Sequence, residues 1–313
     1  MDTMIKDMMG KKLFAIVVAY KGIRWYERCF SSLRYSSIPV QTIVVDNASN
    51  DGSVEYIKER FPEIHLIESK DNLGFGKANN IAMRYVLDQG CDYVFLLNQD
   101  AWIEPDTLEK LIDIHQRNPE YGILGPVQVN AEKTKVLDGV IQFLVNPDNI
   151  NKQMFSDFVM GTIAEVYPVA EINAAAWLLP RKTLETVGGF DPIFLHYGED
   201  WNYLSRVLYH GMKVGLTPHI QVVHDCLEQV DRPKGYEMDF DKWLLQRAAD
   251  ILYPDTQVED MIRQYRRTAM LKLLTFHRAT FKENWDAYRF LKRNRSCIEH
   301  SRNKNKIAGT NWL

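Results

Sequence analysis

The sequence contains few cysteines and no apolar run of membrane-spanning length. Four cysteines lie far apart and form no CxxC pair: Cys29, Cys91, Cys226 and Cys297. This spacing excludes a zinc knuckle and a disulfide framework, and it indicates reduced thiols. Apolar runs such as residues 13–20 and 93–97 fall far short of the roughly 20 residues that span a bilayer. The N-terminal segment lacks the sustained apolar region of a signal peptide, so we expect a cytoplasmic protein.

The composition excludes a disordered or fibrous class. Of 313 residues, 46% are hydrophobic and 12% aromatic, which suffices for one large core or one core with a C-terminal appendage. The net charge of -3 is distributed unevenly, because residues 261–313 hold 13 lysines and arginines against 3 aspartates and glutamates. Such a basic end is typical of a solvated helical face, and equally of a surface that meets anionic lipid headgroups or nucleic acid.

The first half of the chain alternates short apolar runs with helical patterns. Nearly continuous apolar runs occur at residues 13–20, 42–47, 64–69 and 93–100, and they are typical of parallel strands covered on both faces. Helices are predicted over residues 54–60, over an apolar stripe at residues 78–86 that Gly90 ends, and from Pro105 to about residue 117. This βαβαβ order predicts an α/β fold with right-handed crossovers and a twisted, mostly parallel sheet flanked by helices.

The remainder of the chain has a weaker pattern. Residues 122–180 show little periodicity and predict a long loop that crosses the sheet. A helical pattern runs from Asp200 to Gly211, and two short strands are predicted around Pro218. Beyond Asp239 the pattern is helical apart from a break at residues 253–255.

Polar side chains follow several predicted strands at the point where each strand ends. Tyr20, Asp46, Asn47 and residues 98–100 occupy these ends, and open α/β sheets bind ligands beyond the carboxyl ends of their strands. Asp100 could therefore supply an oxygen ligand to a hard divalent cation that bridges two phosphates. The alternative is that Asp100 ends its strand or caps the helix after Pro105.

Two adjacent carboxylates, Glu199 and Asp200, precede a helical pattern. A helix N-terminus favours ionised carboxylates, and a carboxylate that faces a sugar hydroxyl can act as a general base. Ordinary helix capping is the alternative for this pair. His224 ends an apolar run where an imidazole could complete a metal site, although a lone histidine is more often a structural residue.

The segment DNLGFGKANN, residues 71–80, precedes the second predicted helix. It lacks the third glycine of a dinucleotide fingerprint, so a Rossmann dehydrogenase is not supported. Its glycines can simply close a strand-to-helix turn. Lys77 could counter a phosphate, and an exposed lysine at a helix start is the alternative.

Six segments, in this order, resemble the family 2 glycosyltransferases of the GT-A fold, particularly the bacterial rhamnosyltransferase-like members. They are AIVVAY, VVDNASNDGS (44–53), DNLGFGKANN (71–80), FLLNQDAWIEPDTL (95–108), VGGFDPIFLHYGED (187–200) and VVHD (222–225), and together they cover about residues 13–226. The resemblance implies an inverting transfer from a nucleotide diphosphate sugar to an acceptor hydroxyl. It also implies a part in the synthesis of cell-surface polysaccharide, such as capsule, lipopolysaccharide or exopolysaccharide.

The resemblance further implies a role for each matching position. The donor nucleotide would lie against Tyr20, Asp46, Asn47, Asp51, Asn72, Gly74, Lys77 and Asn98, with Asp46 accepting a hydrogen bond from a pyrimidine base. Asp100, joined by His224, would bind Mg²⁺ or Mn²⁺ through the donor diphosphate. Asp200 would be the general base, and Glu199 would orient the acceptor or the base. The implied donor is a UDP-, dTDP- or GDP-sugar, and the implied acceptor is a glycan or a lipid-linked glycan.

Three positions depart from the family pattern. Lys21 stands where relatives often have Asn after the first-strand Tyr, so the contacts of the base pocket differ. Residues 98–100 read Asn-Gln-Asp where many relatives carry Asp-X-Asp, which leaves one carboxylate for the metal. Asn202 replaces a further acidic residue that often follows the Glu-Asp pair.

These patterns predict a GT-A domain over residues 1–235 and a helical, basic extension over residues 236–313. Lipid-linked acceptors lie at the inner leaflet of the membrane. We therefore expect the extension, with Trp285, Tyr288 and Phe290, to dock peripherally on that anionic face and not on nucleic acid.

Two other classes stay open at this point. A sugar-phosphate nucleotidyltransferase has a related sheet, but it needs a glycine-rich, basic first loop, and AYKGIRWYE supplies a single glycine. A non-catalytic subunit that binds nucleotide sugar or glycan is compatible with the missing first Asp of the metal motif. A transferase should release nucleoside diphosphate slowly from a sugar donor with Mn²⁺, and Asp100→Ala should abolish this release, whereas a binding subunit would release none.

Overall fold

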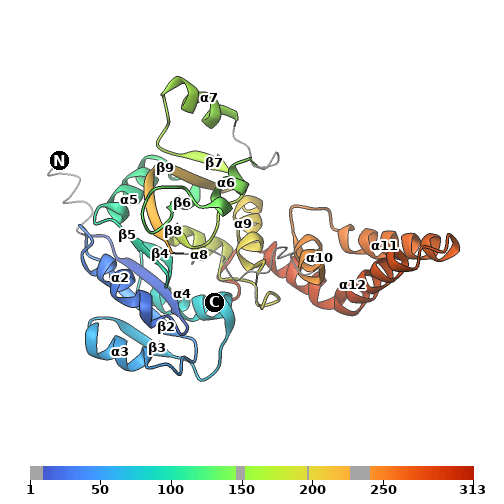
Figure 1. Cartoon of the computed structure of the whole chain (residues 1–313), viewed down its shortest axis with the longest axis horizontal. Coiled ribbons are helices and arrows are strands. Elements are labelled where there is room, and N and C mark those ends of the chain that lie inside the picture. Colours follow the sequence, from blue (N-terminus) through green and yellow to red (C-terminus); the bar gives the residue numbers. More distant parts are fainter. Residues whose placement is uncertain (1–9, 146–151, 196, 226–239) are drawn as a thin grey trace.

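The computed structural model describes residues 10–145, 152–195, 197–225 and 240–313. These residues form one nine-stranded sheet with helices packed against it (Figure 1). The strands lie in the order β3-β2-β1-β4-β8-β6-β9-β5, and β7 pairs with β9. The α/β class expected from the sequence is confirmed.

One half of the sheet is parallel, as the apolar runs predict. Its strands are β3 (His65–Glu68), β2 (Gln41–Asp46), β1 (Leu13–Ala19) and β4 (Tyr93–Asn98). Neighbouring strands pair in parallel and are connected through helices α2 (Ile23–Arg34), α3 (Ser53–Arg60) and α4 (Gly74–Asp88). The carboxyl ends of β1, β2 and β4 therefore meet at one edge of the sheet.

The other half of the sheet is mixed, and it replaces the long loop expected over residues 122–180. That segment contains β6 (Tyr121–Val129), α6 (Asp138–Val145), α7 (Lys152–Met160), β7 (Tyr167–Val169) and β8 (Ala176–Pro180). Strand β8 lies antiparallel between β4 and β6. The loop prediction was wrong because β6 and β8 are completely buried and pair with partners distant in sequence, so neither has an alternating pattern.

The remaining elements complete this half of the sheet. They are β5 (Ala101–Ile103), α5 (Thr107–Arg117), α8 (Arg181–Val187), α9 (Glu199–Tyr209) and β9 (Lys213–His224). The two short strands expected around Pro218 are a single strand, β9, whose register against β6 is irregular at that point. A proline lacks the N–H that a ladder needs, which explains the irregularity.

Two hydrophobic cores cover the two faces of the sheet. Phe14 and Ile16 of β1 belong to the cluster beneath α4, α8 and α9, whereas Ala15 and Val17 belong to the cluster beneath α2, α3 and α5. Alternate residues of a strand point to opposite faces, so β1 is held from both sides. The polar residues at its end are consequently presented from a rigid support.

Helices α10 (Phe240–Ala249), α11 (Gln257–Leu274) and α12 (Arg278–Asn305) form the expected helical C-terminal region. They share an apolar cluster that also contains Phe194, and they project away from the sheet (Figure 1). The chain end then returns, because the N–H of Gly189 donates to the carbonyl of Asn311 at 2.8 Å. The predicted boundary between residues 235 and 236 lies outside the described residues, so this division stays a prediction.

Two predictions from composition can be compared with the structure. Cys29 and Cys91 are buried free thiols and Cys297 is an exposed one, whereas Cys226 lies outside the described residues. Among the described helices, none combines the length and the apolar character that crossing a bilayer requires.

Candidate active site

The carboxyl ends of β1 and β2 form one wall of the candidate site. Tyr20 is exposed directly after β1, and Asp46 and Asn47 are buried at the end of β2. The Oδ2 atom of Asp46 accepts a hydrogen bond from the N–H of Ser49 at 2.9 Å, while its buried Oδ1 atom has no partner among the described residues. Leaving a buried acceptor unpaired is unfavourable. Oδ1 is therefore suited to accept a hydrogen bond from a bound ligand.

Two asparagines fix the start of α4 to the end of β2. The Oδ1 atom of Asn47 accepts from the N–H of Leu73 at 2.7 Å, and its Nδ2 atom donates to Oδ1 of Asn72 at 2.9 Å. The same oxygen of Asn72 accepts from the N–H of Gly74 at 3.0 Å. Asn47, Asn72 and Gly74, three of the predicted donor-binding residues, thus form one hydrogen-bonded unit. Lys77 is exposed one turn further along α4.

Asp51 makes a different set of contacts. Its Oδ1 atom accepts hydrogen bonds from the N–H of Ser53 at 3.2 Å and from the Ser53 hydroxyl at 2.5 Å. Ser53 begins α3 and also accepts from the hydroxyl of Tyr26 at 3.2 Å. Asp51 therefore fixes the start of a helix, and its contact with the donor stays a prediction.

Gln99 joins the end of β1 to the turn that carries Asp100. Its Oε1 atom accepts from the N–H of Tyr20 at 2.8 Å, and its Nε2 atom donates to the carbonyl of Tyr20 at 3.1 Å. Gly22 leaves space for this side chain, since a Cβ atom there would lie 2.3 Å from Oε1 of Gln99. The end of β1 at Tyr20 and the turn that carries Asp100 are therefore held in one arrangement.

Asp100 and His224 face each other across the ends of two paired elements. Ala101 of β5 pairs with His224 of β9, which places the imidazole beside the residue before Ala101. The Nε2 atom of His224 lies 3.4 Å from Oδ1 of Asp100 and 3.4 Å from Nδ2 of Asn98. The sequence prediction that Asp100 and His224 lie together is consistent with this geometry.

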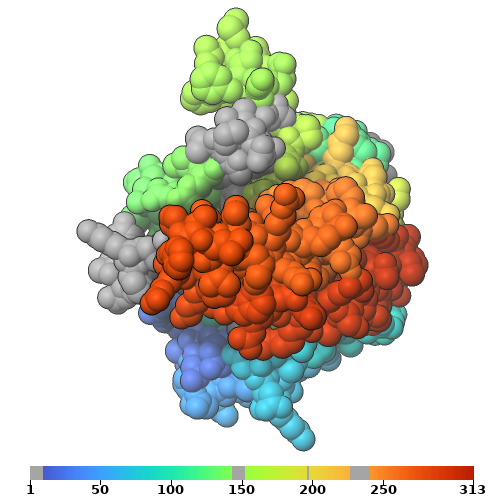
Figure 2. All heavy atoms as spheres, turned by 90° about the vertical axis from the view of Figure 1, so that its right-hand side faces the viewer, coloured from blue at the N-terminus to red at the C-terminus, as the bar shows by residue number. Residues whose placement is uncertain are grey.

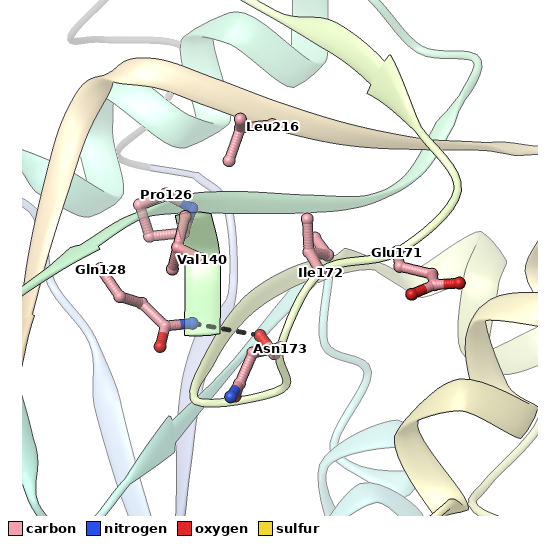
Figure 3. Close-up of a pocket in the computed structure, with 7 residues that line it drawn as sticks. All are labelled: Pro126, Gln128, Val140, Glu171, Ile172, Asn173 and Leu216. Carbon is pink, nitrogen blue, oxygen red and sulfur yellow. Dashed lines mark hydrogen bonds between the residues drawn. The ribbon is translucent and has the colours of Figure 1, made fainter. Parts of the chain in front are cut away.

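Gln128 of β6 orients the His224 ring from the other side. Its Oε1 atom lies 2.9 Å from Nδ1 of His224, and its Nε2 atom donates to the carbonyl of Asn173 at 3.3 Å (Figure 3). An amide oxygen only accepts hydrogen bonds, so Nδ1 carries the hydrogen and the neutral ring has its lone pair on Nε2. Nε2, which lies between Asp100 and Asn98, is thus the ring atom that could bind a metal, with Nδ1 held by its supporting acceptor.

A small pocket lies beside Gln128 and is distinct from the strand ends described above. Figure 3 shows its lining, which combines apolar and polar side chains: Pro126, Gln128, Val140, Glu171, Ile172, Asn173 and Leu216. None of the residues predicted to bind the donor lines it. This region contributes to the candidate site through the hydrogen bond from Gln128 to Asn173, which keeps the amide oxygen of Gln128 turned toward His224.

Asp100 and His224 can provide one oxygen and one nitrogen ligand to a divalent cation. Within residues 10–145, 152–195, 197–225 and 240–313, no group of three or more His, Cys, Asp or Glu side chains could hold a metal ion. Mg²⁺ and Mn²⁺ complete their coordination readily with water and phosphate oxygens. The pair fits a cation whose remaining ligands come from a bound diphosphate.

Glu199 and Asp200 begin α9 directly after Gly198, which has a φ of +100°. Glu199 is buried, and its Oε2 atom has no hydrogen-bond partner among the described residues. Burial raises the pKa of Glu199 to about 7, and the adjacent charge of Asp200 adds to the rise. Burial also raises the pKa of Asp200, whose Oδ1 atom accepts from the N–H of Trp201 at 2.8 Å. Both carboxyls retain protons more readily than ordinary ones, which suits proton transfer.

The carboxylate pair lies against the segment that carries the predicted donor residues. A Cβ atom added to Gly76 in α4 would lie 3.0 Å from the Cβ of Phe190 and 3.7 Å from the Cβ of Glu199. The absence of a side chain at Gly76 therefore allows α4 and the start of α9 to approach closely. This contact brings residues 74–77 and residue 199, far apart in sequence, to the same part of the molecule.

The raised pKa of Glu199 predicts a pH-dependent stability. In the unfolded chain this carboxyl ionises near pH 4.5, but in the folded protein only near pH 7, so its stabilising contribution is complete below pH 4.5 and is lost as the pH rises through 7. We expect the free energy of unfolding of the wild type to fall between about pH 5 and pH 8. The fall should exceed that of Glu199→Gln by up to about 3 kcal/mol. Urea unfolding at both pH values measures this. The exposed Glu55→Gln serves as the control, and parallel curves for Glu199→Gln and the wild type would contradict the assignment.

The loop at residues 187–190, which precedes the carboxylate pair, is held by buried polar side chains. Arg206 is fully buried, donates to the carbonyl of Gly189 at 2.6 Å and also binds the carbonyl of Val187. Burial lowers the pKa of Arg206 to about 10, so the guanidinium still carries its charge at neutral pH. Asn80 of α4 donates to the carbonyl of Phe190 at 2.8 Å and accepts from its N–H at 2.7 Å. The loop is thus fixed to both α4 and α9.

The sequence analysis assigned no role to four residues that shape the site: Asn80, Gln99, Gln128 and Arg206. Asn80 and Gln99 stand inside the segments DNLGFGKANN and FLLNQDAW, so their positions within those segments could have indicated a role. Gln128 and Arg206 give no such signal, because an isolated polar residue in an apolar strand or helix is usually at the surface. Their exposures of 4% and 0% become evident only in the folded chain.

Comparison with known proteins points to one family. A family model described as Glycosyl transferase family 2 matches residues 14–178, more than half of the chain. The matched region contains β1 to β4, α4 and the turn at Asp100. It ends within β8, before the carboxylate pair at the start of α9.

Several characterised proteins are related in sequence. An N-acetylglucosaminyl-diphospho-decaprenol L-rhamnosyltransferase of Mycobacterium tuberculosis is 24% identical over 235 residues, covering 69% of this chain and 76% of the relative. The dTDP-rhamnosyl transferase RfbF of Shigella flexneri is 25% identical over 219 residues, covering 69% and 70%. A low-salt glycan biosynthesis hexosyltransferase, Agl10 of Haloferax volcanii, is 24% identical over 243 residues, covering 77% and 75%.

Solved structures share the fold. A crystal structure of S. aureus TarS 1-349 in complex with UDP has a TM-score of 0.55 at 14% identity and covers 91% of each chain. The mannosyltransferase PcManGT from Pyrobaculum calidifontis, in complex with GDP-Man and Mn²⁺, has a TM-score of 0.53 at 16% identity and covers 95% of this chain and 75% of that one. This likeness shows the fold of the chain, so the predicted GT-A fold is confirmed.

Proposed function

Because this chain belongs to glycosyl transferase family 2, and is therefore a glycosyltransferase, we propose that it moves a sugar from a nucleoside diphosphate donor to an acceptor hydroxyl with inversion. The observation that carries this proposal is the pairing of Asp100 Oδ1 with His224 Nε2 at the ligand edge of the sheet. This edge also contains the buried Oδ1 atom of Asp46, which has no hydrogen-bond partner among the described residues. A nucleotide diphosphate presents both the donor groups and the negative charges that such an edge can bind.

The donor is proposed to lie across the ends of β1, β2 and β4. Asp46 would accept a hydrogen bond from the base through its unpaired Oδ1 atom, and Tyr20 would lie beside the nucleoside. The unit formed by Asn47, Asn72 and Gly74 would support the same cleft, with Lys77 near the phosphates. Because the hydrogen bonds within this unit are already formed, donor binding would lose little conformational entropy in ordering these side chains.

We propose that Asp100 and His224 hold Mg²⁺ or Mn²⁺ together with the donor diphosphate. The cation would neutralise the charge that develops on the departing nucleoside diphosphate. The residues of this chain contribute the fixed positions: Gln99 holds the Asp100 turn against Tyr20, and Gln128 holds Nδ1 of His224, which leaves Nε2 for the cation. Because the Asn98-Gln99-Asp100 turn supplies a single carboxylate, binding of the cation would depend more strongly on the orientation of His224.

Asp200 is proposed to take the proton from the attacking acceptor hydroxyl. Its raised pKa makes it a better proton acceptor than an ordinary aspartate while it is ionised. The oxygen that loses its proton attacks the anomeric carbon from the face opposite the diphosphate, which leaves with the bonding electron pair, and the configuration inverts. Glu199 is proposed to orient the acceptor, since its unpaired Oε2 atom, protonated below a pH of about 7, can donate to a sugar oxygen.

The relatives narrow the class of donor and acceptor that we propose. Two of them are named as rhamnosyltransferases and one as a hexosyltransferase, and one acts on a decaprenol-linked sugar. We therefore propose a deoxyhexose or hexose donor, with a dTDP-sugar as the first to test. The proposed acceptor is a growing glycan, free or lipid-linked, in cell-surface polysaccharide synthesis at the cytoplasmic face of the membrane.

A thermal-shift screen tests the proposed function on the unmodified chain. We expect one nucleoside diphosphate sugar among UDP-, dTDP- and GDP-sugars to raise the melting temperature in the presence of Mn²⁺, because a ligand that binds only the folded state stabilises it. The same compound without Mn²⁺ should give a smaller rise. If no nucleotide sugar produced a metal-dependent shift, while free monosaccharides did, the proposed donor site would be wrong.

A further inference from the structure

The hairpin formed by α11 and α12 ends in a tip of exposed apolar side chains. We define the hairpin tip as residues 271–278, which contain the end of α11, the turn and the start of α12. The exposed fractions are 57% for Leu271, 52% for Leu273, 76% for Leu274 and 89% for Phe276. Figure 1 shows the α11–α12 hairpin extending away from the sheet, and Figure 2 looks onto this side of the molecule. Adjacent exposed apolar side chains of this kind mark a surface that contacts another molecule.

The turn that presents Phe276 is ordered by backbone hydrogen bonds. The N–H of Phe276 donates to the carbonyl of Leu273 at 3.2 Å, and that of His277 donates to the carbonyl of Lys272 at 3.0 Å. Phe276 itself has a φ of +60°, a conformation that bulky residues rarely adopt and that Gly or Asn adopts with less strain. A fixed, strained turn therefore holds an aromatic ring outward, where it contributes almost nothing to the core.

Basic residues outnumber acidic ones around the tip. Residues 261–286 contain six lysines and arginines against two acidic residues, Glu283 and Asp286. Arg263 pairs with Asp260, but five members of the set form no ion pair within the described part of the chain: Arg266, Arg267, Lys272, Arg278 and Lys282. A basic collar around an apolar point complements an anionic lipid surface, which offers negative headgroups above a hydrocarbon layer.

The aromatic residues that the sequence indicated for membrane contact lie elsewhere on α12. Trp285 stacks against Phe281 at a centroid distance of 6.0 Å and contacts Tyr288 at 5.1 Å, and all three are half-buried. Phe290 packs against the apolar cluster of the helical region. Their side chains are therefore partly occupied by contacts within the hairpin, whereas the side chains of the tip are not.

We propose that the hairpin tip is the element by which this enzyme docks on an anionic lipid bilayer. Leu274 and Phe276 enter the interfacial layer, and the flanking lysines and arginines contact the headgroups. Each basic residue near such a surface strengthens binding roughly fivefold, and each large apolar side chain that leaves water adds a further factor of roughly ten or more. The proposal deepens the membrane-face location given under the proposed function, but binding to lipid requires no donor, metal or acceptor. The lipid-docking proposal and the proposed function can therefore be refuted by different experiments.

Vesicle flotation of the full chain tests this assignment. We expect the wild type to float with phosphatidylcholine vesicles that contain about 30% phosphatidylglycerol, to float poorly with pure phosphatidylcholine, and to be released by salt. The double variant Leu274→Asn, Phe276→Asn is expected to bind the anionic vesicles roughly 100-fold more weakly. Asn suits the positive φ at position 276, so the turn should stay folded. Donor turnover in solution should be unchanged, because neither residue belongs to the candidate active site.

The matched control is on α7, which also carries exposed aromatic rings. Phe155 and Phe158 are each 68% exposed, but the helix has one lysine, Lys152, and one aspartate, Asp157, so it lacks a basic collar. Phe155→Asn, Phe158→Asn should float like the wild type. Equal loss in both double variants would overturn the assignment to the hairpin tip. A second outcome would also overturn it. The wild type would fail to bind anionic vesicles and would form a dimer in sedimentation, and the tip variant would be a monomer, because the tip would then join two copies.

Discussion

Replacing Asp200 with Asn is expected to lower sugar transfer by about 100- to 10,000-fold while leaving donor affinity unchanged. The amide keeps the size of the side chain, and its oxygen can still accept the hydrogen bond from the N–H of Trp201, so α9 should begin as before. An amide cannot take the proton of the acceptor hydroxyl, and the effect should therefore fall on turnover alone. The measurement is the release of nucleoside diphosphate from the donor identified by thermal shift, with water or sugar as acceptor.

The control for this prediction is Glu185→Gln on α8. Glu185 is an exposed carboxylate that pairs with Arg181, so its loss should leave turnover at the wild-type rate. A wild-type rate for Asp200→Asn would remove the general-base assignment. A loss of donor binding equal to the loss of turnover would instead indicate that Asp200 contacts the donor and not the acceptor.

Replacing Asp100 with Asn is expected to remove the stimulation of turnover by Mn²⁺ and to lower the rate at saturating Mn²⁺ by at least about 100-fold, equivalent to about 3 kcal/mol. The residue provides the single carboxylate of the Asn98-Gln99-Asp100 turn, and its Oδ1 atom faces Nε2 of His224. An amide oxygen is a weaker ligand for a divalent cation. Donor turnover measured against Mn²⁺ concentration gives the comparison.

Two further variants define this second prediction. Asp106→Asn removes an exposed carboxylate that pairs with Lys110 a few residues away, and it should respond to Mn²⁺ like the wild type. Gln128→Leu removes the acceptor for Nδ1 of His224 and should weaken the Mn²⁺ response by about 10- to 100-fold, as the loss of a supporting partner does. An unaltered Mn²⁺ response in Asp100→Asn would exclude this carboxylate as a ligand.

The parallel half of the sheet could be predicted because its signals are local. Each of β1, β2 and β4 is a short apolar run followed at once by a polar residue, and α4 follows a glycine-containing turn. Residues at the ends of parallel strands share one edge whatever the details of packing. For the same reason Tyr20, Asp46 and Asp100 could be assigned to one site from the sequence.

The mixed half could not be predicted because its pairings are distant in sequence. Strand β8 inserts between β4 and β6, and β9 pairs with β5, β6 and β7, so the burial of these strands depends on partners that no local pattern reveals. Likewise, His224 ends a strand like many structural histidines. Its role becomes apparent only from Gln128 on one side of the ring and Asp100 on the other.

The return of the C-terminus is a second long-range feature. Asp191, in the loop before the carboxylate pair, accepts hydrogen bonds from Ser301 and Asn305 of α12. The basic, polar composition of α12 predicted a solvated helical face or a surface that meets anionic lipid, and it gave no sign of this contact. The end of α12 is nevertheless buried against this loop, which couples the helical region to the support of the site.

The proposed mechanism divides two tasks between two residues: Asp100 neutralises charge and Asp200 removes the proton. Titration of the donor's nucleoside diphosphate into the wild type, Asp100→Asn and Asp200→Asn, with and without Mn²⁺, tests this separation most directly. The proposed mechanism predicts that Mn²⁺ strengthens binding in the wild type and in Asp200→Asn, and has little effect in Asp100→Asn. Equal strengthening by Mn²⁺ in Asp100→Asn, or its loss in Asp200→Asn, would contradict it.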